Sequence, residues 1–288
     1  MPRTATPLEP LIDAVEGAQG LDDLAKPLAK QVRGLLNRPG ALKDALSGTW
    51  LGHAVHPMLT DVVIGSFLSA TILDALGDDG AASEKLIAVG LAAYAPTALT
   101  GANDWADTEP VSDAVRRAGL VHATTNLAAM TLYGASLKAR RNGRRAKGAA
   151  LGAAGATVLM AAGYLGGHLS FTRGVGGDQT VYDAGPDDWT TAADASQLPE
   201  GRPTRVVVDE TPVLLLRRGE RFYAIHDRCS HRGCSLSDGE VEGERVICAC
   251  HGSSFDLTTG AVERGPATAP QPAFQTRVSE GRVEVRRL

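Results

Sequence analysis

The segments CSHRGCSL (229–236) and CACHGSSF (248–255) contain all four cysteines of the 288-residue chain and two of its seven histidines. Each segment supplies one cysteine followed closely by one histidine: Cys229 with His231, and Cys248 with His251. Zinc accepts two thiolates and two imidazoles, but zinc fingers pair cysteine with cysteine and histidine with histidine. Mixed loops instead favour a 2Fe–2S cluster, with two cysteines on one iron and two histidines on the other.

Through this double motif, residues 202–288 resemble the Rieske iron–sulfur family. The resemblance implies that the four residues above bind the cluster. It also implies that Cys234 and Cys250 form the disulfide that links the two cluster loops in cytochrome bc-type members. The alternative is a pair of free buried thiols. A structural disulfide would favour an oxidising compartment.

Residues beside the motif bear on the reduction potential. By the same resemblance, Ser253 matches a serine whose hydroxyl donates to a cluster sulfur, whereas Phe255 stands where high-potential members have a tyrosine. Hydrogen bonds to the sulfurs stabilise the reduced cluster, so the missing hydroxyl predicts a lower potential. The segment GPATAP (265–270) resembles the third loop that shields the cluster.

Short β-rich runs around the motif predict a small antiparallel, all-β domain over residues 202–288. The runs are RVVV (205–208), PVLLL (212–216), RFYAI (221–225), RVIC (245–248), SSFDL (253–257), TRVS (276–279) and RVEVR (282–286). The Gly-, Asp- and Pro-rich residues 174–201 predict a linker before this domain. His226 lies outside the ligand pattern, and we expect it to be a structural or surface residue.

Residues 51–173 contain four stretches suited to membrane-spanning helices, which need roughly 20 apolar residues. The stretches are 57–77, 86–102, 118–137 and 149–169, and the first is interrupted by Asp61 and Asp74. A soluble bundle would need amphipathic helices, but these stretches are apolar or small around most of the helix. They predict a four-helix α-helical transmembrane bundle. Residues 1–50 predict amphipathic helices that lie on the membrane or on the bundle.

Three motifs, LGHAVHPMLTD (51–61), TGANDW (100–105) and LVHA (120–123), resemble an uncharacterised family of four-helix bacterial membrane domains. The loop KARRNGRRAK (138–147) has six basic residues and no acidic one, so the positive-inside rule predicts that it faces the cytoplasm. Four spans then place both termini outside. The expected location is the cell membrane, multi-pass, with the cluster domain on the extracytoplasmic face.

The alternation of four spans brings four histidines to one membrane face, namely His53, His56, His122 and His168. Ionisable residues within membrane segments usually mark function. Because imidazole ligates haem iron, zinc and copper, we expect a second site here, for haem b, another metal or a quinone. The alternative is a polar cap that meets only the lipid headgroups.

A net charge of −4 and a pI near 6.0 give no electrostatic reason to expect a nucleic-acid partner. A cluster with four protein ligands has no open coordination position. We therefore expect an electron-transfer component rather than a stand-alone catalyst, with the lipid bilayer and a quinone, haem or respiratory protein as partners. The alternatives are a membrane-tethered ferredoxin of an oxygenase system and a non-catalytic redox sensor.

Overall fold

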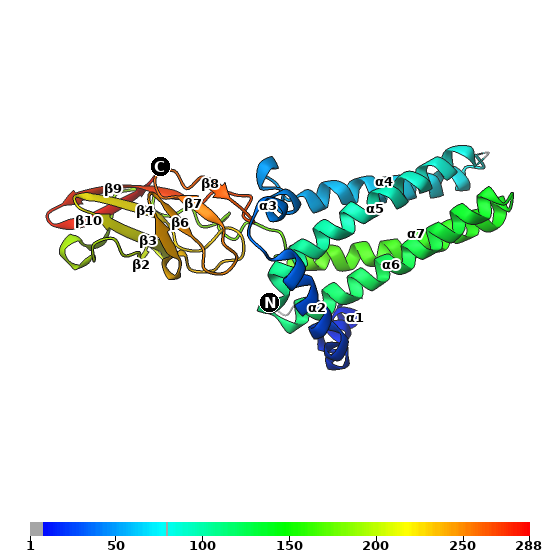
Figure 1. Cartoon of the computed structure of the whole chain (residues 1–288), viewed down its shortest axis with the longest axis horizontal. Coiled ribbons are helices and arrows are strands. Elements are labelled where there is room, and N and C mark those ends of the chain that lie inside the picture. Colours follow the sequence, from blue (N-terminus) through cyan, green and yellow to red (C-terminus); the bar gives the residue numbers. More distant parts are fainter. Residues whose placement is uncertain (1–7, 79) are drawn as a thin grey trace. The chain divides into compact units, whose positions relative to one another are not determined.

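The computed structural model describes residues 8–78 and 80–288, and these fall into two compact units, which we describe separately. The helical unit contains the chain up to Asn37 together with Val55–Val175. The β unit contains Arg38–Ala54 together with Gly176–Leu288. Figure 1 shows the helices and strands of both units.

Four long helices form an antiparallel bundle in the helical unit (Figure 1). They are α4 (Val55–Ala75), α5 (Ala81–Thr108), α6 (Asp113–Arg141) and α7 (Arg145–Gly167), and one π-helical turn, His168–Thr172, follows α7. Each of the four helices packs against the next, and α4 also packs against α7, which closes the ring. The helices α4 and α6 therefore lie diagonally across the bundle.

Aromatic rings fill the centre of this bundle. Phe67 on α4 and Tyr133 on α6 stack with their ring centroids 3.8 Å apart. A Cβ atom on Gly90 would lie 2.7 Å from the Phe67 ring, and one on Gly155 would lie 3.0 Å from the Tyr133 ring. Small residues let neighbouring helices approach closely, and here they make room for the two rings.

Three helical segments of the unit are long and apolar enough to cross a membrane: Val55–Ala75, Ala81–Val111 and Arg145–Thr172. The predicted span 118–137 is helical, as part of α6, but it is not one of the three, because His122, Thr124 and Asn126 lower its hydropathy. The prediction of four spans is thus supported for three. Asp74, which interrupts the first of them, is paired with Arg140 of α6.

Two shorter helices, α1 (Glu9–Gly17) and α2 (Asp22–Leu36), pack on the outside of the bundle. Arg117 of α6 donates to both carboxylate oxygens of Asp22, at 2.8 and 2.7 Å. Residues 1–50 were expected to form helices that lie on the membrane or on the bundle, and α1 and α2 lie on the bundle. Residues 1–7 lie outside the described part of the chain. The end of that segment differs from the prediction, since residues 38–54 belong to the β unit.

The β unit contains two antiparallel sheets. The first has six strands in the order β1-β10-β9-β4-β3-β2 and the second has four in the order β5-β6-β7-β8. The first comprises β1 (Thr190–Asp194), β2 (Thr204–Val208), β3 (Thr211–Arg218), β4 (Arg221–His226), β9 (Ala273–Ser279) and β10 (Arg282–Arg287). The second comprises β5 (Glu240–Glu242), β6 (Arg245–Ile247), β7 (Ser254–Asp256) and β8 (Val262–Arg264).

The strand β3 shows why the run PVLLL is apolar throughout. Its residues Leu214 and Leu216 enter one hydrophobic core, together with Cys229, Cys248 and residues of the second sheet. Val213 and Leu215 face the opposite way, into a core shared with β2, β9 and β10. A strand that is covered on both faces has no solvent side, so it carries no polar alternation.

The predicted linker 174–201 requires a correction. The strand β1 lies inside it and pairs with β10 along the edge of the six-stranded sheet, Thr190 opposite Val285 and Asp194 opposite Arg282. The β domain therefore begins before residue 202. The sequence TTAAD has few apolar side chains because β1 is an edge strand with an interrupted register.

Candidate metal centre

The first of the two cysteine–histidine loops follows β4 and is closed by its own backbone. The amide of Cys229 donates to the carbonyl of Cys234 at 2.8 Å, and the amide of Gly233 donates back to the carbonyl of Cys229 at 2.7 Å. Gly233 has a φ of +75°, in the left-handed region that favours glycine. The loop thereby turns the Cys229 side chain into the core.

The second loop follows β6 and repeats this geometry. The amide of Cys248 donates to the carbonyl of Ser253 at 2.8 Å, and the amide of Gly252, at a φ of +76°, donates to the carbonyl of Cys248 at 3.0 Å. A predicted ligand cysteine therefore occupies the same position in both loops. The two histidines differ by one position, since His231 is two residues after its cysteine and His251 is three residues after its own.

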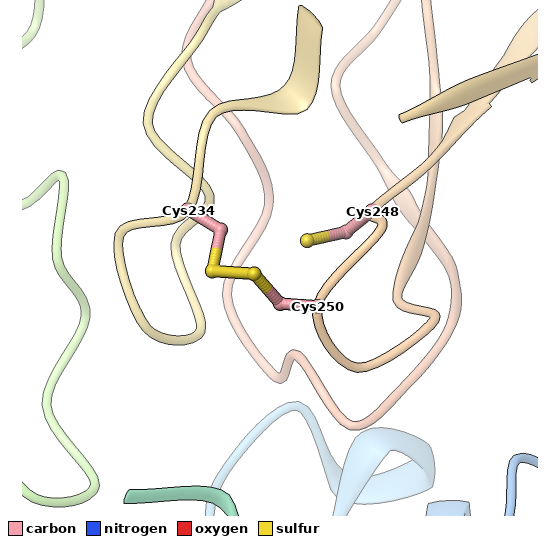
Figure 2. Close-up of side chains that lie close together, drawn as sticks. All are labelled: Cys234, Cys248 and Cys250. Atoms are coloured by element: carbon pink, nitrogen blue, oxygen red, sulfur yellow. A yellow bond between two sulfur atoms is a disulfide. The ribbon is translucent and has the colours of Figure 1, made fainter. Parts of the chain in front are cut away.

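A disulfide joins the two loops. Cys234 and Cys250 are bonded, with their Cα atoms 6.6 Å apart, and Figure 2 shows the side chain of Cys248 directed toward this bond. The three sulfurs lie within 4.8 Å of one another, but a disulfide sulfur is not a thiolate, so this trio is not a metal-binding set. Cys229 and Cys248 are the two free thiols, and both are buried.

The four predicted ligands form two adjacent pairs. The rings of His231 and His251 lie with their centroids 5.0 Å apart and nearly perpendicular, at 87°. The Cys229 and Cys248 thiols are hydrogen-bonded to each other; this bond, helped by burial, raises the pKa of Cys229, and the same bond lowers the pKa of Cys248 to about 7. The bond therefore favours the thiolate, the form of cysteine that binds metal, at Cys248 over Cys229.

The third loop, residues 265–270, is bonded to both ligand loops. Ser230 Oγ in the first loop donates to the carbonyl of Ala269 at 2.8 Å. The amide of Ala267 donates to Ser253 Oγ in the second loop at 3.0 Å. This amide uses the oxygen of Ser253 as an acceptor and leaves the hydroxyl hydrogen for another partner. The resemblance assigns that hydrogen to a cluster sulfur, and the fully buried Ser253 is compatible with that role.

Phe255 is fully buried in the same core as Cys229 and Cys248. A tyrosine at this position would carry its hydroxyl among these residues, whereas phenylalanine brings no donor. Two free cysteines, two adjacent imidazoles and a buried serine make a donor set that fits a 2Fe–2S cluster.

Two contacts around the site were not foreseen from the sequence. The buried carboxylate of Asp227 accepts from Ser235 Oγ at 2.7 Å and from the amide of Ser237 at 2.8 Å, which fixes the far side of the first loop. His226 is fully buried, with Nε2 3.0 Å from Asp183 Oδ2, so its role is structural. The one local signal for the Asp227 network is Ser235, which lies within the first motif.

The third loop also contacts a segment from the beginning of the chain. The segment contains α3 (Ala41–Ser47) and the 3-10 turn Thr49–Leu51. Thr49 Oγ1 donates to the carbonyl of Ala267 at 3.2 Å, and a Cβ on Gly252 would lie 3.4 Å from Pro39. Nothing in the local sequence of residues 38–54 indicates this long-range contact.

The four histidines of the predicted second site have different surroundings. His56 and His122 lie in the bundle, with Nδ1 2.9 Å from the carbonyls of Thr97 and Ala162, respectively. His168 Nε2 lies 2.8 Å from Glu16 Oε1, so a carboxylate already uses that nitrogen. His53 is exposed and belongs to the β unit. The structure therefore narrows the candidate set to His56 and His122.

Comparisons with known proteins match the two units separately. A family model described as "Rieske [2Fe-2S] domain" matches residues 188–275, and one described as "Predicted membrane protein (DUF2231)" matches residues 52–179. Ferredoxin CarAc of Metapseudomonas resinovorans is 37% identical over 98 residues, which are 34% of this chain and 92% of the relative.

Two further relatives are ferredoxins. The 3-phenylpropionate/cinnamic acid dioxygenase ferredoxin subunit of Escherichia coli K12 is 39% identical over 92 residues, 31% of this chain and 85% of that protein. A solved structure, the ferredoxin of carbazole 1,9a-dioxygenase from Nocardioides aromaticivorans IC177, is 31% identical with a TM-score of 0.33. The match covers 35% of this chain and 98% of that ferredoxin.

Replacing both Cys234 and Cys250 by alanine should weaken the hold between the loops. The bond closes a loop with a sequence separation of 16 residues. Losing it should lower the free energy of unfolding by about 3 kcal/mol, and heating should release the cluster earlier than in the wild type. Thermal melts followed by the visible circular dichroism of the cluster test this. The disulfide itself is refuted if denatured, non-reduced protein labels at all four cysteines.

Phe255→Tyr should raise the midpoint potential of the cluster, because the added hydroxyl can donate to a ligand sulfur and stabilise the reduced state. Ser253→Ala removes a hydroxyl from the same site and should move the midpoint the opposite way. Redox titration of the two variants and the wild type measures both shifts. An unchanged or lower midpoint in a folded Phe255→Tyr protein contradicts this role for the hydroxyl.

Proposed function

Because the chain belongs to the Rieske [2Fe–2S] family through residues 188–275, we propose that it is a membrane-anchored carrier of single electrons. The four predicted ligands would occupy every protein-derived position of the cluster and would leave no place for a substrate on iron. When bound, the cluster supplies reversible one-electron chemistry. The protein is then a component of an electron-transfer system, with its reaction completed by a partner.

The observation that carries this proposal is the unequal burial of the ligands. Cys229 and Cys248 are only 1% and 2% exposed, whereas His231 and His251 are partly exposed. The imidazole edge is therefore the side on which a partner can approach the cluster most closely. The buried side is sealed by Phe255, Leu236 and other apolar residues, which exclude water from the sulfurs.

The surrounding residues have positioning roles in this proposal. The disulfide and the paired backbone bonds hold the two loops at a fixed separation, so the ligands need little rearrangement when the electron arrives. Ser253, oriented by the amide of Ala267, adjusts the potential through its hydroxyl. The third loop excludes water while leaving the imidazoles accessible.

The membrane is the proposed setting for this transfer. Residues 52–179 match a family of predicted membrane proteins, and three helical segments are apolar and long enough to span a bilayer. We place the basic loop 138–147 in the cytoplasm and the β unit outside. The partner is then a quinone, a haem or a respiratory protein that works at the outer membrane surface.

A second candidate function is supported by the names of the relatives, which are ferredoxin subunits of dioxygenases. Under this alternative the β unit feeds electrons to a separate oxygenase. The potential discriminates between the two candidates within the family range of about −150 to +300 mV. A midpoint near the low end favours the oxygenase partner, and one near the high end favours a quinone-linked partner.

The ligand assignment predicts a rhombic Rieske-type EPR signal in the reduced protein, with an average g below the free-electron value. Cys229→Ser and His251→Ala should each abolish it, because each removes an iron ligand. His226→Gln provides a matched control, since that histidine is buried nearby without being a ligand. Purified, iron-replete wild-type protein that lacks the signal would contradict the ligand assignment.

The proposed orientation predicts that protease added to intact spheroplasts will cleave residues 176–189, which follow the helical unit, and separate residues 190–288 from the helices. The loop 138–147 should be cut only after the membrane is opened. Immunoblots against tags at both ends follow the fragments. Protection of residues 176–189, with cleavage of the basic loop from outside, would reverse the orientation.

A further inference from the structure

The bundle is built from two helical hairpins of the same design. His56, Phe67 and Asp74 on α4 are each 66 positions before their counterparts His122, Tyr133 and Arg140 on α6. Gly90, Thr97 and Gly101 on α5 are each 65 positions before Gly155, Ala162 and Gly166 on α7. The two hairpins therefore place equivalent residues at equivalent heights in the bundle.

The counterparts also meet across the bundle. Phe67 stacks on Tyr133, and Arg140 Nη1 donates to Asp74 Oδ1 at 3.0 Å. Both contacts join α4 to α6, so a local two-fold axis runs between these diagonal helices. By the same spacing, His56 and His122 are the third pair of counterparts on α4 and α6.

The two histidines are held in the same way. In each hairpin the Nδ1 atom is 2.9 Å from a backbone carbonyl of the second helix, Thr97 for His56 and Ala162 for His122. A carbonyl only accepts, so Nδ1 carries the hydrogen and the lone pair resides on Nε2. Proteins usually orient a metal-binding imidazole by a hydrogen bond from its other ring nitrogen to a carbonyl, a carboxylate or water.

A glycine lies against each imidazole, one helical turn after the carbonyl acceptor. A Cβ on Gly101 would lie 2.6 Å from Cε1 of His56, and a Cβ on Gly166 would lie 3.0 Å from Cε1 of His122. Any larger residue would push the ring away from its position. Asn126 Nδ2 donates to the backbone carbonyl of His122 at 2.9 Å and lies 3.2 Å from its Nε2, so iron at Nε2 would replace the second of these contacts and leave the first in place.

The number of ligands limits the kind of metal site. Among the described residues, no third histidine, cysteine, aspartate or glutamate joins these two imidazoles in a group of donor atoms within 4.8 Å. Zinc sites in proteins use three or four protein ligands. Haem iron takes four nitrogens from the porphyrin and needs only two axial ligands, which a pair of imidazoles can supply.

We propose that His56 and His122 would be the two axial ligands of a haem iron bound between α4 and α6, near the start of α4. The two-fold arrangement of the hairpins suits a cofactor that is approached from opposite sides by identical ligands. Haem iron and a 2Fe–2S cluster both exchange single electrons. The proposal rests only on the helical unit and holds whatever partner the β unit serves.

The test is the haem content of the full-length protein, purified in detergent from cells supplied with 5-aminolaevulinate. The wild type should have a Soret band, a low-spin spectrum and one haem per chain by pyridine haemochrome assay. His56→Ala and His122→Ala should each reduce the haem content by about tenfold or more. The Rieske EPR signal of each variant reports that the protein has folded.

A pair of glycine variants on α7 provides the matched control. Gly166→Ala places a methyl group against His122 and should also reduce haem content, whereas Gly163→Ala has open space around its new Cβ and should not. His53→Ala, at an exposed position, should likewise retain haem.

Three outcomes would overturn the proposal: wild type that stays haem-free after incubation with haemin, haem retained in both histidine variants, or zinc, copper or quinone bound at these residues instead. Loss of the EPR signal with haem retained would count against the cluster assignment alone. The two conclusions are therefore tested separately.

Discussion

The candidate metal centre depends on one constraint, which is that two separate loops must present the predicted ligands at a fixed separation. Each loop closes on itself by the same pair of backbone bonds around a ligand cysteine, and the Cys234–Cys250 bond ties the loops together. Two serines then attach the third loop to both. The sheets serve this arrangement, since β4 and β6 deliver the cysteines and β3 supplies apolar residues behind them. The chemistry follows, with buried sulfurs on one side and accessible imidazoles on the other.

The helical unit also repeats one structural element, since its four long helices form two hairpins of the same design. Repetition brings equivalent residues together across a local axis, so one solution for packing a ring on a glycine serves twice. Phe67 and Tyr133 fill the middle, and Asp74 with Arg140 provides a buried ion pair that would be costly if either partner were alone. The same repetition places Nδ1 of both His56 and His122 against a backbone carbonyl, so both rings carry their hydrogen on Nδ1. A fold that gathers paired side chains in this way is well suited to a symmetrical ligand.

The sequence was most informative where the chemistry is local. The cysteine–histidine spacing predicted a ligand set, and the β-rich runs predicted seven of the strands. The disulfide was predicted only through the family resemblance. The strand β1 was missed because TTAAD has few of the apolar residues that mark a strand. The partner of His168 is Glu16, which is too distant in sequence for periodicity to reveal. The hairpin repeat was missed because it consists of a few positions at a long spacing, without overall similarity.

The most direct test of the central claim is Mössbauer spectroscopy of the full-length protein enriched in ⁵⁷Fe. Two cysteines on one iron and two histidines on the other make the two irons chemically different. The reduced cluster should therefore contribute two components of equal area, one ferric and sulfur-ligated and the other ferrous and histidine-ligated, separate from the signal of any haem iron. Two irons with identical parameters, as four cysteine ligands would produce, or iron absent from the β unit, would contradict the account.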